Sequence, residues 1–214
     1  MLFRSVLPMG SPNINVKYLP KFFNPEKRHH GFFGLMMIFP IVGIIIGCFL
    51  LYLTKNWIIG FYEEKSPLFT HYFFLVVPLA IYITLIYTLN SYCNAIFKTV
   101  IPSFLNDILN RVLLIGLILL YFFNYLDLDG FLNGFVTIYA LQALILFIYI
   151  LIIGRPGFIP DVTYLKSNVG FRFILRYGII VSFTSISSVS LKFLDSIFLA
   201  KHNLESVEIG RAHV

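Results

Sequence analysis

Long apolar runs without a charged residue limit most strongly what this chain can fold into. Residues 31–53 contain no Asp, Glu, Lys or Arg, and residues 68–89 contain none either. A helix that crosses the hydrocarbon core of a bilayer needs about 20 consecutive, mostly apolar residues. Each of these two runs is therefore long enough to predict one membrane-spanning helix.

The composition points to the same class of protein. Hydrophobic residues make up 58% of the 214 residues and charged residues 12%, whereas soluble domains have about 45–50% and about 25%. The chain therefore has too few polar side chains to cover a water-soluble globule, and its 24 Phe and 13 Tyr exclude a disordered chain. The two cysteines, Cys48 and Cys93, have no metal-site spacing, and no secretory signal peptide is visible.

Five segments are long and apolar enough, or nearly so, and they predict an all-α, polytopic bundle of transmembrane helices. The third reaches full length only if it is extended back over Asp107 and Arg111, which are four residues apart and are expected to pair on one helix face. The fifth is the most polar. The predicted spans are residues 31–53, 68–89, 104–123, 131–153 and 173–200.

Positive charge alternates between the segments that separate the spans. Residues 17–30, 90–111 and 154–176 hold four, two and four Lys or Arg residues, whereas the opposite segments hold three. Because Lys and Arg collect in cytoplasmic loops, we expect residues 17–30, 90–104 and 154–173 to be cytoplasmic. The net charge of +6 is then a topology signal, and no nucleic-acid partner is needed to explain it.

Two of the loop segments have a composition of their own. The prolines and charges of residues 17–30 predict a cytoplasmic turn. Residues 154–173 are rich in Pro and Gly and form the one candidate boundary between two halves of the chain. Within that segment, residues 163–172 are expected to lie along the membrane surface as a short amphipathic helix.

Lys192 and Asp195 are the sharpest candidates for function, because they lie three residues apart inside the fifth predicted span. A charge in the bilayer is costly, so such a residue usually faces a cavity or a partner. Asp195 would then bind a coupling proton or sodium ion in a translocation pathway; alternatively, the two side chains pair with each other near the outer interface. Ser185, Ser188 and Lys192 are spaced i, i+3 and i+7, so they lie on one face of the predicted helix. The two serines would line the cavity or let helices pack closely.

A basic cluster of Lys17, Lys21, Lys27 and Arg28 precedes the first span. It would attract a lipid pyrophosphate, or it serves only as a topology signal. The adjacent residues 29–30, both histidines, are either a pH-sensing or phosphate-binding pair or a solvated cluster at the interface. Motifs of metal, nucleophile or phosphate-loop chemistry are absent from the sequence, which predicts a protein that is not an enzyme and holds no cofactor or metal.

The two ends of the chain are expected to be foreign to the protein. Residues 208–214, Glu-Ile-Gly-Arg-Ala-His-Val, and residues 1–5, Met-Leu-Phe-Arg-Ser, back-translate to the two strands of a widely used sequencing adapter. Residues 6–207 are therefore expected to be an internal fragment of a longer protein.

Three stretches resemble one family of bacterial membrane proteins. Residues 16–22, Val-Lys-Tyr-Leu-Pro-Lys-Phe, and residues 26–32, Glu-Lys-Arg-His-His-Gly-Phe, are similar to the turn after that family's second helix. Residues 97–106, followed by Arg111, resemble the turn before its fifth helix, and residues 194–200, Leu-Asp-Ser-Ile-Phe-Leu-Ala, resemble its seventh. The family is that of the polysaccharide or lipopolysaccharide biosynthesis flippases of the multidrug/oligosaccharidyl-lipid/polysaccharide exporter superfamily, in its Bacteroidetes-type branch.

This resemblance implies that the five spans are helices three to seven of an exporter with twelve to fourteen helices in two lobes. Residues 6–153 would then run from the end of helix two through the N-terminal lobe, residues 154–173 would link the lobes, and residues 174–207 would begin the C-terminal lobe.

The activity that the resemblance implies is transport across the bacterial inner membrane. A lipid-linked oligosaccharide or polysaccharide precursor would pass from the inner to the outer leaflet by alternating access. The bilayer and the lipid-linked glycan would be the partners. A multidrug cation antiporter of the same superfamily and a membrane enzyme of glycan assembly are the alternatives.

Overall fold

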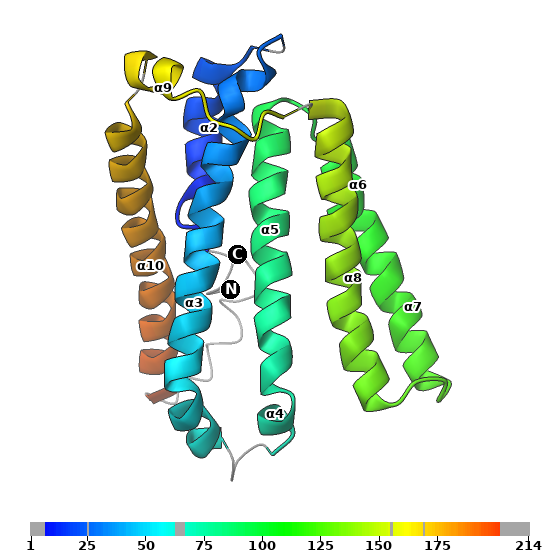
Figure 1. The fold of residues 1–214 in the computed structure, drawn as a ribbon. Coiled ribbons are helices and arrows are strands. Elements are labelled where there is room, and N and C mark those ends of the chain that lie inside the picture. Colours follow the sequence, from blue (N-terminus) through cyan, green and yellow to red (C-terminus); the bar gives the residue numbers. More distant parts are fainter. Residues whose placement is uncertain (1–6, 25, 63–66, 155, 169, 202–214) are drawn as a thin grey trace.

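Helices run up and down between two ends of the molecule in the computed structural model (Figure 1). The structure describes residues 7–24, 26–62, 67–154, 156–168 and 170–201, and every regular element in these ranges is helical. The elements are α2 (Ser11–Phe22), the turn η1 (Arg28–Gly31), α3 (Phe32–Tyr62), α4 (Pro67–His71), the turn η2 (Phe73–Leu75), α5 (Val76–Ala95), α6 (Val100–Phe104), the π-turn η3 (Leu105–Leu109), α7 (Asn110–Phe122), α8 (Leu128–Tyr149), the π-turn η4 (Ile150–Gly154), α9 (Val162–Asn168) and α10 (Phe171–Lys201).

Four helical segments are long and apolar enough to cross a membrane, which indicates a multi-pass membrane protein. They are Arg28–Gly60, Phe73–Ala95, Val100–Phe122 and Leu128–Ile153. These segments overlap the first four predicted spans, although the second runs from Phe73 to Ala95 where residues 68–89 were expected, and the backward extension of the third span over residues 104–111 is confirmed. The fifth predicted span falls on α10, which has 31 residues; the count of five spans stays a prediction.

The prediction of a turn over residues 17–30 is wrong in its first part, because Lys17 and Lys21 lie on helix α2. Four apolar residues of α2 recur at helical spacing and are buried, namely Ile14, Tyr18, Leu19 and Phe22. Packing of this face stabilises the helix despite Pro20, which removes one backbone hydrogen bond close to the C-terminal end. The chain turns only after Phe22. The short helix expected over residues 163–172 is met only in its first part, because α9 ends at Asn168 and Arg172 already belongs to α10; its place along the membrane surface stays a prediction.

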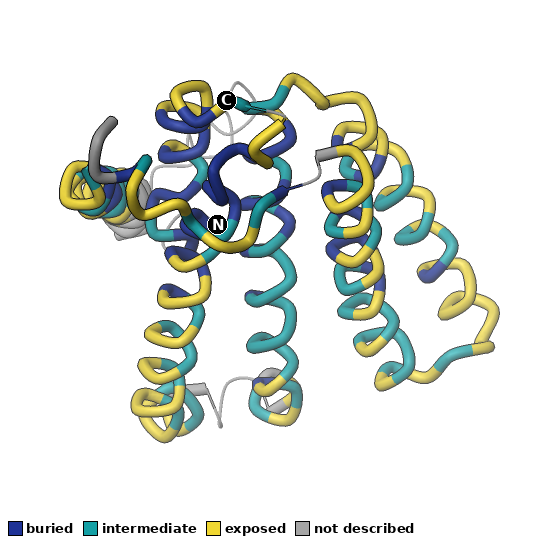
Figure 2. Tube along the Cα trace, turned by 45° about the horizontal axis from the view of Figure 1, so that its top comes forward, coloured by how far each residue is buried: buried dark blue, intermediate teal, exposed yellow. Residues whose placement is uncertain are grey.

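Helix α2 lies at the centre of the described bundle and contacts α3, α5 and α10. Figure 2 shows that buried residues gather around α2 and the adjoining halves of α3 and α5. The segment that leads into α2 lies directly against α3, since a Cβ atom on Gly43 would come within 1.9 Å of the carbonyl oxygen of Leu7. Helices α7 and α8 form a hairpin that joins this group through contacts between α8 and α5 (Figure 1).

A row of polar side chains joins α2 to α5 inside this apolar bundle. The row, here called the polar seam, consists of Ser11, Asn15, Thr88 and Ser91, all buried. The Nδ2 atom of Asn15 donates to Ser91 Oγ at 2.5 Å and to the carbonyl oxygen of Thr88 at 3.5 Å, and the hydroxyls of Ser11 and Thr88 are 3.2 Å apart. Interhelical hydrogen bonds of this kind hold helices together in membranes, where apolar contacts with lipid are as favourable as those with protein.

Replacing Asn15 with leucine tests this interface. Asn15→Leu removes two interhelical hydrogen bonds and keeps the number and branching of the side-chain heavy atoms, so we expect the free energy of unfolding to fall by about 1 kcal/mol. Titration of the purified protein with a denaturing detergent measures the change. Asn94→Leu is the matched control, because Asn94 is exposed near the end of α5. Equal stability of the two variants would contradict the role of the polar seam.

Candidate functional site

The turn between α2 and α3 has an unusual backbone. Arg28, His29, His30 and Gly31 have φ angles of 48°, 55°, 51° and 69°, so four consecutive residues adopt the left-handed conformation. That conformation costs roughly 1–2 kcal/mol for each residue other than glycine. A run of this kind persists only where the surrounding structure holds it in place, and such runs are concentrated at functional and switch sites.

The segment that follows α8 supplies the contacts that hold this turn. Residues 156–161 cross over the turn at the end of the bundle where α9 lies, here called the α9 end (Figure 1). The amide of Gly157 donates to the carbonyl oxygen of Arg28 at 3.1 Å, and the amide of Asp161 donates to that of His30 at 3.0 Å. A Cβ atom on Gly31 would lie 1.8 Å from the carbonyl oxygen of Ile159. Only glycine therefore allows this close approach.

Side-chain contacts of His30 reinforce the same junction. The imidazole is 8% exposed and stacks on the ring of Tyr164 in α9, with a centroid distance of 3.7 Å and an angle of 6° between the rings. Its Nδ1 atom lies 3.4 Å from Oδ2 of Asp161. The hydroxyl of Tyr164 donates to the carbonyl oxygen of Lys21 at 3.2 Å, which extends the contact to α2.

The carboxylate of Asp161 is held in its ionised form. Its Oδ1 atom accepts a hydrogen bond of 3.1 Å from the amide of Tyr164, at the start of α9. This backbone hydrogen bond, followed by the hydrogen bond from His30, lowers the pKa of Asp161. The stability that the carboxylate contributes is therefore present above the ordinary pKa of an Asp, about 3.9, and is lost only as the pH falls through the lowered value.

Two members of the basic cluster lie one helical turn apart on the exposed side of α2. The Nζ atom of Lys17 is 3.7 Å from the ring centroid of Tyr177 in α10 and 5.4 Å from that of Tyr18. The Nζ atom of Lys21 is 5.7 Å from the same Tyr18 ring. Two ammonium groups thus approach one aromatic ring, and cation–π attraction places them there.

The structure brings the four predicted basic residues to one end of the bundle. Lys27 and Arg28 are exposed in the turn, close along the chain to Lys17 and Lys21. None of the four has a carboxylate partner in the described part of the chain, where the one ion pair is that of His30 with Asp161. The α9 end therefore carries four basic side chains that form no ion pair with a carboxylate of the described residues.

Asp107 and Arg111 do not form the expected pair, and both side chains are exposed. The π-turn η3 is the physical reason, because residues 105–109 follow an i→i+5 hydrogen-bond pattern in which residues four apart no longer align. Instead, the residue before Asp107 forms a hydrogen bond to another helix. The Oδ1 atom of Asn106 accepts from Nε2 of Gln142 in α8 at 2.5 Å. The i, i+4 spacing of a regular α-helix does not predict this contact.

The candidates on α10 are placed only in part. The Ser188 hydroxyl is exposed and donates to the carbonyl oxygen of Thr184 on its own helix at 2.9 Å, which satisfies it without a ligand. Ser185 is half-buried. The side chains of Lys192 and Asp195 lie outside the described residues, so both alternatives for that pair stay predictions.

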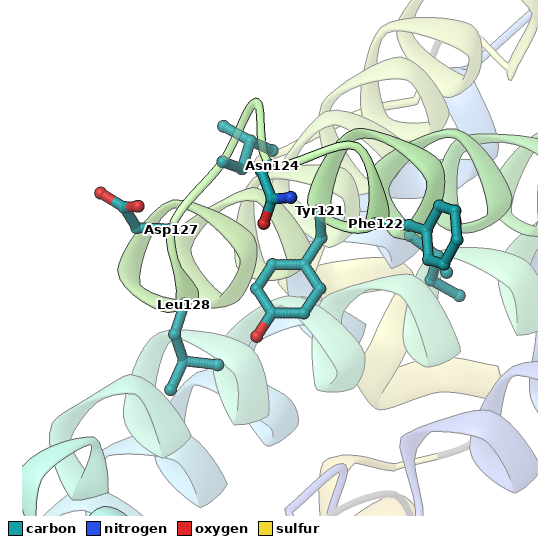
Figure 3. A pocket seen from close by; sticks show the side chains of 7 residues that line it. Tyr121, Phe122, Asn124, Asp127 and Leu128 are labelled. Carbon is teal, nitrogen blue, oxygen red and sulfur yellow. The ribbon is translucent and has the colours of Figure 1, made fainter.

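A shallow hollow lies at the other end of the bundle, between α7 and α8 (Figure 3). Its volume of about 470 Å³ would suit a small ligand, but the rings of Tyr121 and Phe122 beside it are 43% and 73% exposed. Asn124 and Asp127 are its polar members and belong to the connection between the helices. No group of three or more side chains able to hold a metal ion occurs in the described ranges. The α9 end is therefore the better candidate for a functional site.

Replacing Gly31 with alanine tests the close approach of the two segments. A Cβ atom in Gly31→Ala collides with the Ile159 carbonyl and strains a left-handed residue, so residues 156–161 should leave the turn. Limited proteolysis of this segment should become several-fold faster. Gly116→Ala is the matched control, since its Cβ would meet nothing within 4 Å. Unchanged cleavage in Gly31→Ala would show that the glycine is not required.

Comparisons with known proteins add no family to these observations. No protein-family model, no curated protein and no solved structure matches the chain. The residues at the α9 end and the three resembling stretches are therefore the features of the chain that bear on its function.

Proposed function

We propose that the chain is part of a membrane exporter that moves a lipid-linked oligosaccharide from the inner to the outer leaflet by alternating access. The observation that carries this proposal is the set of basic side chains at the α9 end, none of which has a carboxylate partner in the described ranges. Lys17 and Lys21 define its centre, beside the rings of Tyr18 and Tyr177. The resemblance of the three sequence stretches to the flippase family supports the same function.

Electrostatics favours an anionic ligand at this position. Ammonium groups one helical turn apart repel each other, and a phosphate between Lys17 and Lys21 would relieve that repulsion through charge-assisted hydrogen bonds. The pyrophosphate of a lipid carrier supplies this chemistry at the depth of the inner leaflet. Lys and Arg at the cytoplasmic end of a bundle would thus both orient the protein and attract the lipid head group.

The interior of the bundle supports a polar cargo. Asn15 is fully buried, and its Oδ1 atom has no hydrogen-bond partner among the described residues. A buried acceptor without a donor costs roughly 1–3 kcal/mol, and the hydroxyl of a sugar would satisfy it once α2 and α5 separate. The polar seam therefore gives the glycan a hydrogen-bonding surface along the path that begins at the basic end.

Removing both central lysines should weaken binding of the lipid head group. We expect the double variant Lys17→Ala with Lys21→Ala to bind vesicles that contain a polyprenyl pyrophosphate about tenfold or more weakly, because two charge-assisted contacts are lost. Vesicle flotation at low and high salt measures the change, and added salt should reduce the difference. Lys55→Ala is the matched control, because the Lys55 ammonium lies over the ring of Phe74 near the other end of the bundle.

Two results would contradict the proposal. One is equal binding of polyprenyl pyrophosphate by the double variant and by Lys55→Ala. The other is preferential binding of a lipophilic cation such as ethidium, which would favour the multidrug antiporter instead.

A further inference from the structure

We propose that helix α7 forms a membrane-embedded interface with a second copy of this chain, in which Asp107 of each copy pairs with Arg111 of the other. The interface lies on the outer side of α7, at the edge of the described bundle. The inference goes beyond the proposed function, because it concerns how two copies of the chain associate whatever the cargo is.

The depth of these two charges in the membrane is the first argument. Asp107 and Arg111 both belong to the third candidate span. Asn106, the residue before Asp107, accepts a hydrogen bond from Gln142, and Gln142 lies near the middle of the candidate span Leu128–Ile153. Asp107 is therefore level with the middle of the neighbouring helix, and Arg111 follows one turn later. A charge at that depth is costly and usually faces a partner.

Neither charge has a partner within its own copy. Asp107 and Arg111 are exposed and form no ion pair with any described residue. Helix α7 packs against α8 and lies at one edge of the described bundle, with α10 at the opposite edge (Figure 1). The outer side of α7 therefore meets either lipid or another protein. Hydrocarbon offers neither an acid nor a base a partner, which favours a protein.

Apolar residues beside the charges fit a contact between two helices. Gly116 borders them, and a Cβ atom there would meet nothing within 4 Å, so this surface is open to close approach. Alternating steps of four and three residues are the heptad pattern of helices that cross at about 20°. The exposed residues that follow this pattern, here called the α7 stripe, are Ile108, Val112, Ile115, Leu119 and Phe122. Lipid would suit the stripe equally well, but the charges beside it select a protein.

The arrangement of the charges selects a second copy of this chain. Copies of one sequence insert in the same orientation, because the same basic residues collect on one side of the membrane. Two α7 helices then meet in parallel around a two-fold axis, which requires a self-complementary face. A face with one acid and one base meets that requirement, since Asp107 of each copy comes beside Arg111 of the other. Their offset of about 6 Å along the helix is within reach of the long arginine side chain.

Disulfide cross-linking of the full chain in lipid vesicles tests the position of the interface. With Cys48 and Cys93 replaced by serine, Ile115→Cys places one thiol in the middle of the α7 stripe. Leu144→Cys on α8 is the matched control, because the two side chains are 57% and 54% exposed. We expect mild oxidation to give about fivefold or more covalent dimer in Ile115→Cys, since only the axis brings two Cβ atoms within the roughly 4 Å of a disulfide.

Charge exchange tests the pairing itself, in chains that carry two different affinity tags. Asp107→Arg leaves two bases on the interface, and Arg111→Glu leaves two acids. We expect each variant to recover copies of itself about tenfold less efficiently than the unaltered chain does, because like charges then face each other. Mixing the two variants should restore recovery, a result that pairing within one copy cannot give. Lys55→Glu is the matched control and should leave recovery unchanged, since Lys55 lies on α3 over the ring of Phe74.

Either of two results would overturn the proposal. One is cross-linking of Ile115→Cys that is no stronger than that of Leu144→Cys. The other is recovery of the mixed pair that is no better than that of each variant alone. If a charge variant does not fold, the cross-linking comparison still decides, because it leaves both charges in place. Both readouts are taken without cargo, so their failure is distinct from failure of the lipid-binding test.

Discussion

The packing of helix α2 is the interaction on which the rest of the described structure depends. One face of this short helix buries Ile14, Leu19 and Phe22 in the core. A neighbouring face places Asn15 against α5 through interhelical hydrogen bonds. The remaining surface carries Lys17 and Lys21 at the α9 end. Because α2 contacts α3, α5 and α10 together, it sets where the polar seam, the basic cluster and the left-handed turn lie relative to one another.

The bilayer explains why the sequence predicted most of the architecture. A backbone in hydrocarbon must satisfy its own hydrogen bonds, so an apolar run of sufficient length becomes a helix whatever its neighbours are. The four long helices follow from that rule. Helix α2 differs from the expected turn because Pro20 and the nearby charges are typical of a loop, whereas the buried face of Ile14, Tyr18 and Phe22 stabilises a helix. The spacing of these three residues is visible in the sequence and predicts a helix.

The candidate site was predictable in its charges and not in its contacts. The positions of Lys17, Lys21, Lys27 and Arg28 follow from the rule that basic residues collect at one end of a membrane protein. The pairing of His30 with Asp161 joins positions 131 residues apart, and no local pattern encodes it. Gly31 is the one local signal of this junction in the sequence. Glycine is typical of a left-handed backbone and of a close approach by another backbone, and both occur at this position.

The central claim is that the basic α9 end faces the cytoplasm, and labelling of single cysteines tests it most directly. With Cys48 and Cys93 replaced by serine, one cysteine is introduced at Lys27 in the turn and another, in a second variant, at Tyr125 between α7 and α8. Right-side-out membrane vesicles are then treated with a membrane-impermeant maleimide. We expect Tyr125→Cys to be labelled at once and Lys27→Cys to be labelled only after the membrane is permeabilised. Immediate labelling of Lys27→Cys, with Tyr125→Cys protected, would contradict it.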